Sequence, residues 1–160
     1  MSTASSAETR SIADSGNLVA AAIAGVIGTI GFGGLQMVMG SAQVIAGAFP
    51  ALYTLDPSLA VGWVIHLFHG AVLGIVFAAI VSQTPLRQYL DNILAMVGLG
   101  LAYGVVTTVA LAWILLPVWL GVVGFPQAPP FPNIAVSSLI GHLVYGALLG
   151  GVYAPLQTRL

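Results

Sequence analysis

Charged side chains are so rare in this sequence that they limit what it can fold into. The 160 residues include only three Lys or Arg and four Asp or Glu, whereas about a quarter of a typical water-soluble domain is charged. These seven residues leave three charge-free stretches, at 15–55, 57–86 and 92–158. A helix needs roughly 20 apolar residues to cross the hydrocarbon core of a bilayer. The sequence therefore predicts an integral membrane protein surrounded by lipid.

One apolar segment occurs twice in the chain. Residues 66–78 read HLFHGAVLGIVFA, and residues 142–154, which lie 76 positions later, read HLVYGALLGGVYA. A Phe-Pro pair at 49–50 recurs at the same offset at 125–126. We therefore interpret the chain as a duplicated hairpin, with repeat one at residues 17–84 and repeat two at residues 92–160.

The apolar segments predict an all-α, integral membrane four-helix bundle. We expect spans at about residues 18–39, 59–82, 93–116 and 134–154, all within a single membrane domain at residues 17–160. Residues 1–16 are rich in Ser, Thr and Ala, which favours a flexible tail. Each hairpin returns to the side on which it starts, so the two repeats should have parallel topology and be related by a pseudo-twofold axis along the membrane normal.

The arginines predict the orientation in the membrane. Arg10, Arg87 and Arg159 all fall on one side of a four-span bundle, whereas the loops at 40–58 and 117–133 contain no Lys or Arg. By the positive-inside rule, both termini are then cytoplasmic in a multi-pass protein of the cell membrane. The two outer loops are apolar and contain prolines. We expect short interfacial helices or loops that form a packing collar there, with a binding mouth as the alternative.

Small residues recur at every fourth position around a histidine in the second and fourth spans. Positions four apart lie on one face of a helix, and faces of small residues let membrane helices approach closely. These faces should therefore point into the bundle rather than toward lipid. The positions are Gly62, His66, Gly70 and Gly74 in the second span, and His142, Gly146 and Gly150 in the fourth.

His66 and His142 are expected at the same depth, on equivalent inward faces. Other polar groups expected nearby are His69, Tyr145, Thr29, Thr107 and Thr108. A first hypothesis is structural: each imidazole hydrogen-bonds a neighbouring helix, through one of the threonines or a backbone carbonyl, in a membrane subunit or scaffold. Intramembrane ionisable residues are otherwise candidates for function.

Two functional hypotheses stay open beside the structural one. His66 and His142 would suit the axial ligands of a b-type haem, or ligands of copper or a similar ion, for membrane electron transfer. Against this, no carboxylate in the spans would orient either ring. Alternatively, the histidines, Tyr145 and the threonines would line a pathway for protons or a small solute.

Other classes of function lack the residues that they need. The chain contains no Cys, which excludes a disulfide framework and thiolate metal sites. We find no catalytic constellation and expect no enzyme, because no serine has acid–base partners near it. The sequence has no basic patch for nucleic acid. The sequence leaves open whether the chain forms a homo-oligomer or binds a partner in a membrane complex.

One pattern resembles a known group of proteins. Residues 63–78 follow WxxHLxHGxxLGxxFA, and FPALY precedes them at 49–53. This pattern resembles a family of small four-helix membrane proteins common in halophilic archaea, and the similarity covers most of the chain. The resemblance implies an archaeal source and the four-span fold. It implies no activity and no site residues.

Overall fold

The computed structural model describes residues 4–160, and the side chains of residues 18–160. The predicted tail at 1–16 lies partly outside the described residues, and from Ala4 the backbone is helical and runs into the first span. The described chain contains helices and loops only. In chain order the helices are α1 (Ala4–Val38), η1 (Val44–Ala48), α2 (Phe49–Ala51), α3 (Leu59–Gln83), η2 (Pro85–Tyr89), α4 (Ile93–Thr107), η3 (Thr108–Leu115), α5 (Leu116–Val122) and α6 (Val136–Leu156).

Four helical segments are long and apolar enough to cross a membrane. They are Leu18–Val38, Leu59–Gln83, Ile93–Val122 and Val136–Leu156. Three of them match the expected spans to within two residues. Polar caps help to fix two of the helix starts, because Ser58 Oγ accepts a hydrogen bond from Val61 N and Asn92 Oδ1 accepts one from Ala95 N.

The third span is longer than predicted. It was expected to end at about residue 116, but the helix continues through α5 to Val122. The eight residues before α5 form a π-helix, Thr108–Leu115, and Pro117 then lies in the first turn of α5. Proline is tolerated in a first turn because the missing N–H has no partner there in any case. The span therefore changes from α-helix to π-helix and back to α-helix, and it continues past the point at which we expected it to end.

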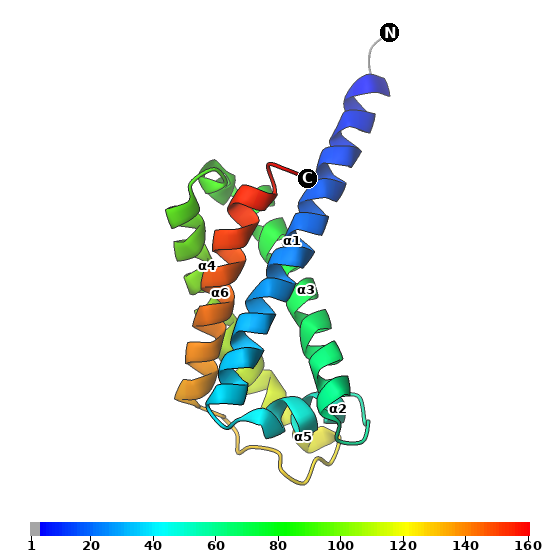
Figure 1. Cartoon of the computed structure of the whole chain (residues 1–160), viewed down its shortest axis with the longest axis vertical. Coiled ribbons are helices and arrows are strands. Elements are labelled where there is room, and N and C mark those ends of the chain that lie inside the picture. Colours follow the sequence, from blue (N-terminus) through cyan, green and yellow to red (C-terminus); the bar gives the residue numbers. More distant parts are fainter. Residues whose placement is uncertain (1–3) are drawn as a thin grey trace.

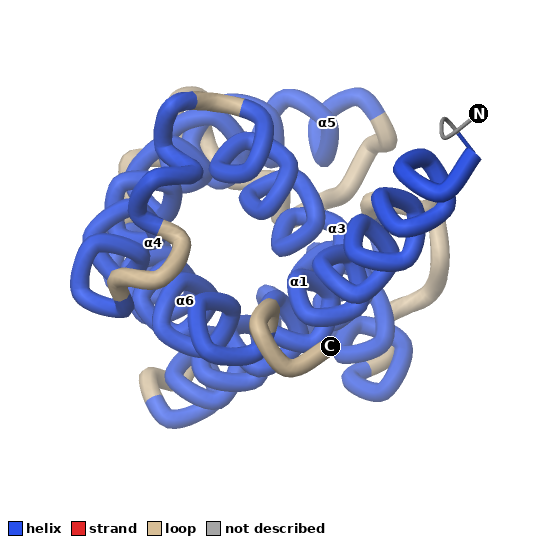
Figure 2. The backbone as a smooth tube through the Cα atoms, turned by 90° about the horizontal axis from the view of Figure 1, so that it is seen from above, coloured by secondary structure: helices blue, strands red, loops and turns tan. Residues whose placement is uncertain are grey.

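The long helices form a ring in the order α4, α6, α1, α3. Figure 2 shows this ring from above, and α1 packs on both α3 and α6 while α4 packs on α6. In Figure 1 the C-terminus and η2 lie at one end of the bundle, called the terminal end, and α2 and α5 lie at the other, called the loop end. The remaining face, between α3 and α4, has little backbone packing.

Glycines bring the packed helices into backbone contact. A Cβ atom on Gly25 of α1 would overlap the carbonyl of Gly70 on α3, and one on Gly100 of α4 would overlap the carbonyl of Gly146 on α6. Each remaining glycine predicted to pack has a backbone or side-chain neighbour in the same way: Gly74 meets Ala21 and Gly25, Gly150 meets Met96, and Gly62 meets Ile45 of η1. The predicted small-residue faces thus lie where helices approach most closely.

Two tyrosine hydroxyls tie α3 to the second half of the chain. Tyr145 of α6 donates a hydrogen bond of 2.9 Å to the carbonyl of Gly70. Tyr103 of α4 donates one of 3.0 Å to the carbonyl of Leu73, across the face where α3 and α4 have little other packing. Below them, the terminal end is filled by an apolar core that includes Ala20, Phe77, Met96, Leu149 and Tyr153.

Candidate functional site

The loop end of the bundle contains a cavity of about 1180 Å³. Residues from α1, η1, α2, α3, η3, α5 and α6 line it, and most of them are apolar. Proteins commonly bind small molecules in mostly apolar cavities of roughly 300–1,000 Å³ that carry a few well-placed polar groups. The polar side chains on this wall include all three histidines of the chain: His66, His69 and His142.

His66 is clamped between aromatic rings and is only 6% exposed. Phe49 stacks on the imidazole at a centroid distance of 4.5 Å, and Phe32 meets it edge-on at 5.3 Å. Nε2 of His66 is buried and has no hydrogen-bond partner among the described residues. A buried polar atom without a partner costs about 1–3 kcal/mol. The fold therefore holds an unpaired nitrogen against the cavity wall.

His142 is held in a different way, by its own helix and by Phe32. Its Nδ1 lies 2.7 Å from the carbonyl oxygen of Ser138, one turn earlier on α6. The other side of the imidazole packs on Phe32, at a centroid distance of 4.7 Å. A backbone carbonyl often orients a histidine through Nδ1, leaving Nε2 for another partner. The Ser138 carbonyl therefore orients the His142 ring, a role that the sequence analysis considered only for a carboxylate.

His69 is bonded to the loop that covers the cavity. The hydroxyl of Tyr53 lies 2.7 Å from Nε2 of His69. The neighbouring residue Leu52 accepts a hydrogen bond of 2.9 Å from the indole N–H of Trp119 on α5. The segment at 40–58 is thus joined to α3 and to α5 over the loop end. This arrangement is a packing collar that also forms part of the cavity wall.

The interhelical hydrogen bonds expected of His66 and His142 are absent from the described part of the chain. His142 bonds within its own helix, and His66 has no bond. The threonines also turn back on their own helices: Thr29 donates to Gly25 O, Thr107 to Tyr103 O and Thr108 to Gly104 O. Longer side chains make interhelical bonds instead: Tyr103 and Tyr145 each donate to a carbonyl of α3, and Trp113 of η3 donates to Ser138 Oγ of α6.

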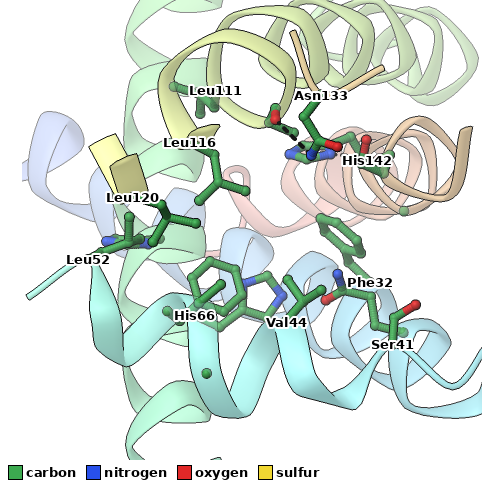
Figure 3. Close-up of a pocket in the computed structure, with 18 of the residues that line it drawn as sticks. Phe32, Ser41, Val44, Leu52, His66, Leu111, Leu116, Leu120, Asn133 and His142 are labelled. Atoms are coloured by element: carbon green, nitrogen blue, oxygen red, sulfur yellow. Dashed lines mark hydrogen bonds between the residues drawn. The ribbon is translucent and has the colours of Figure 1, made fainter. Parts of the chain in front are cut away.

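Phe32 bears on the bis-histidine hypothesis. Figure 3 shows the Phe32 ring between His66 and His142, and the ring packs against both imidazoles. Phe32 therefore occupies the place that a haem iron or metal ion shared by the two rings would take.

The polar lining does not continue through the bundle. Thr29, Tyr145 and the three histidines border the cavity, whereas Thr107 and Thr108 do not. Toward the terminal end the apolar core is closed by buried side chains such as Phe77, Met96 and Leu149. The site has the form of a pocket that ends inside the protein, which favours binding over passage of protons or a solute.

Several residues of the site were not singled out from the sequence. Phe32, Phe49 and Gln36 all line the cavity, and Gln36 Oε1 is a second buried polar atom without a described partner. Phe32 and Gln36 lie four residues apart on α1, so they share one helix face. That spacing was the available signal, but single Phe and Gln residues in an apolar span do not distinguish a cavity wall from ordinary packing.

The chain has no detected counterpart among known proteins: no protein-family model, no curated protein and no solved structure matches it.

Proposed function

We propose that this membrane protein binds a small lipophilic molecule in the cavity at its loop end. The observation that carries the proposal is a largely apolar cavity of about 1180 Å³ whose wall includes the imidazole of His142, oriented by the carbonyl of Ser138. A ligand with one polar group would bury its apolar part in the cavity and pair its polar group with this imidazole. The resemblance to halophilic archaeal membrane proteins stays a prediction and adds nothing to this proposal.

The surrounding contacts support binding rather than a purely structural role for the histidines. A polar residue kept for helix association should bond a neighbouring helix, and neither His66 nor His142 does so within the described chain. Phe32 and Phe49 fix the His66 ring by packing alone. Side chains held in place by rigid neighbours are what a preformed binding site requires.

Narrowing the cavity should weaken binding. Ala112 is buried on the cavity wall, and Ala110, two residues away on η3, is exposed. With protein in lipid nanodiscs, the probe 12-bromododecan-1-ol should quench tryptophan fluorescence saturably in the wild type and in Ala110→Phe. Ala112→Phe should need a higher mole fraction of the probe for half-maximal quenching, because its ring takes up part of the space. Linear quenching in the wild type, the behaviour of a probe that is only dissolved in lipid, would overturn the proposal.

We also propose that the bundle is a pair of parallel hairpin repeats in the cell membrane, with both termini cytoplasmic. Equivalent glycines make equivalent contacts in the two halves, Gly25 with Gly70 and Gly100 with Gly146, which supports the duplication. The arginine bias supports the orientation. A twofold axis would make the α3–α4 pair equivalent to the α1–α6 pair. However, α1 packs on α6 whereas α3 and α4 have little packing, so the helix contacts are not fully twofold symmetric.

The absence of cysteine makes the orientation easy to test. Gln88 in η2 and Gln127 in the second outer loop are both exposed. In intact cells, a membrane-impermeant maleimide should label Gln127→Cys, whereas Gln88→Cys should react only after the membrane is permeabilised. Labelling of Gln88→Cys in intact cells, with Gln127→Cys protected, would reverse the proposed orientation.

A further inference from the structure

The hydrogen bond of His142 defines which of its nitrogens carries a hydrogen. A carbonyl oxygen accepts hydrogen bonds and cannot donate them, so the 2.7 Å contact with Ser138 O requires a hydrogen on Nδ1. A neutral imidazole has only one N–H. Nε2 of His142 must then carry a lone pair, and it acts as a hydrogen-bond acceptor with no partner among the described residues.

The surroundings keep this acceptor in place. Ser138 O holds Nδ1 on one edge of the ring, and Phe32 packs against the ring at 4.7 Å. Rotating the ring would break the first contact and disturb the second. His142 lines the cavity, so the acceptor belongs to the binding site and not to a contact between helices. Figure 3 shows the imidazole on the α6 side of the cavity, close to Asn133.

The cavity combines a large apolar surface with the oriented Nε2 acceptor of His142. A ligand that only accepts hydrogen bonds, such as an ether, would leave the His142 acceptor without a partner. A ligand with a hydroxyl group would satisfy it.

We propose that the ligand of this cavity is a lipophilic alcohol or phenol whose hydroxyl donates a hydrogen bond to Nε2 of His142. This inference rests on the proposed binding function and adds the chemical class of the ligand. The apolar part of the molecule lies among the cavity's apolar side chains. The hydroxyl lies at the His142 ring, which Ser138 O and Phe32 have oriented in advance.

The test compares two probes of which only one has a hydrogen-bond donor, because a methyl group replaces the hydroxyl hydrogen in the other. These are 12-bromododecan-1-ol and its methyl ether, titrated by tryptophan quenching in nanodiscs, with affinities expressed as mole fractions in the lipid. The wild type should bind the alcohol about threefold to tenfold more tightly than the ether, the range expected for one hydrogen bond. In His142→Phe the preference should fall to about one, because the ring remains and the acceptor is lost.

Ala110→Phe is the control. It adds a ring at an exposed position of η3 that does not line the cavity, so the preference for the alcohol should remain. Equal saturable binding of both probes by the wild type would overturn the hydroxyl assignment and leave the binding function standing. No saturable binding of either probe would overturn the binding function itself.

A spectroscopic measurement tests the acceptor without any variant in the site. In 15N-labelled protein, Nε2 of His142 should give a pyridine-like resonance and Nδ1 a pyrrole-like one. The alcohol should shift the Nε2 resonance, and the ether should not. A pyrrole-like Nε2 in the neutral ring would overturn the proposal even if His142→Phe failed to fold.

Discussion

Replacing Gly100 by alanine is expected to destabilise the bundle by about 1–3 kcal/mol, the usual cost of forcing extra atoms into a tightly packed contact. A Cβ at Gly100 would overlap the carbonyl of Gly146, which belongs to the backbone of α6 and has no rotamer by which to move aside. The two helices would have to separate, and the dispersion contacts along their shared face would weaken. The free energy of unfolding in mixed micelles, followed by helical circular dichroism as the SDS fraction rises, measures the effect.

Gly98 provides the matched control on the same helix. A Cβ at Gly98 would have no heavy atom within 4 Å. Gly98→Ala should therefore leave stability unchanged or raise it by up to about 1 kcal/mol, since alanine is the better helix former. If both variants lose the same amount, glycine content and not the α4–α6 contact would set the stability. If neither variant loses stability, α4 and α6 do not approach each other as closely at Gly100 as the structure shows.

Much of the helical architecture was predictable because its signals are local and repeated. The charge-free runs, the proline-containing loops and the repeated segment together indicate four long helices and their approximate bounds. The spacing of Gly70, Gly74, Gly146 and Gly150 identifies the faces that pack. The extent of the third span was missed because Pro117 normally marks the end of a helix. Only the π-helical stretch before it shows how the helix continues.

The site was predictable in part, for a related reason. The repeat singled out His66 and His142, and both line the cavity. What each imidazole does depends on contacts that the sequence does not reveal: the carbonyl of Ser138, the ring of Phe32 and the stacking of Phe49 on His66. A backbone carbonyl is present at every residue, so no motif marks the one that orients a ring. The duplication predicted equal roles, whereas unequal neighbours give the two histidines different ones.

Phe32→Ala should be the most destabilising single substitution at the site, at about 3–5 kcal/mol, the range for removing a buried phenylalanine. The Phe32 side chain is 6% exposed and packs against both imidazoles. It also packs so closely on Gly141 that a Cβ there would overlap the ring. Truncation would enlarge the cavity and remove the contact that holds His66 and His142 apart. The same SDS titration measures the loss.

Phe68→Ala is the control for this prediction, because it removes the same ring from a side chain that is 60% exposed on α3. Its cost should stay below about 1 kcal/mol, as is usual for surface substitutions. Phe32→Ala should also reduce the preference for an alcohol over its ether, since the His142 ring would lose the neighbour that orients it. A variant that lost stability but kept full alcohol preference would show that Ser138 O alone positions the imidazole. A loss no larger than that of Phe68→Ala would mean that Phe32 does not form the wall between the two histidines.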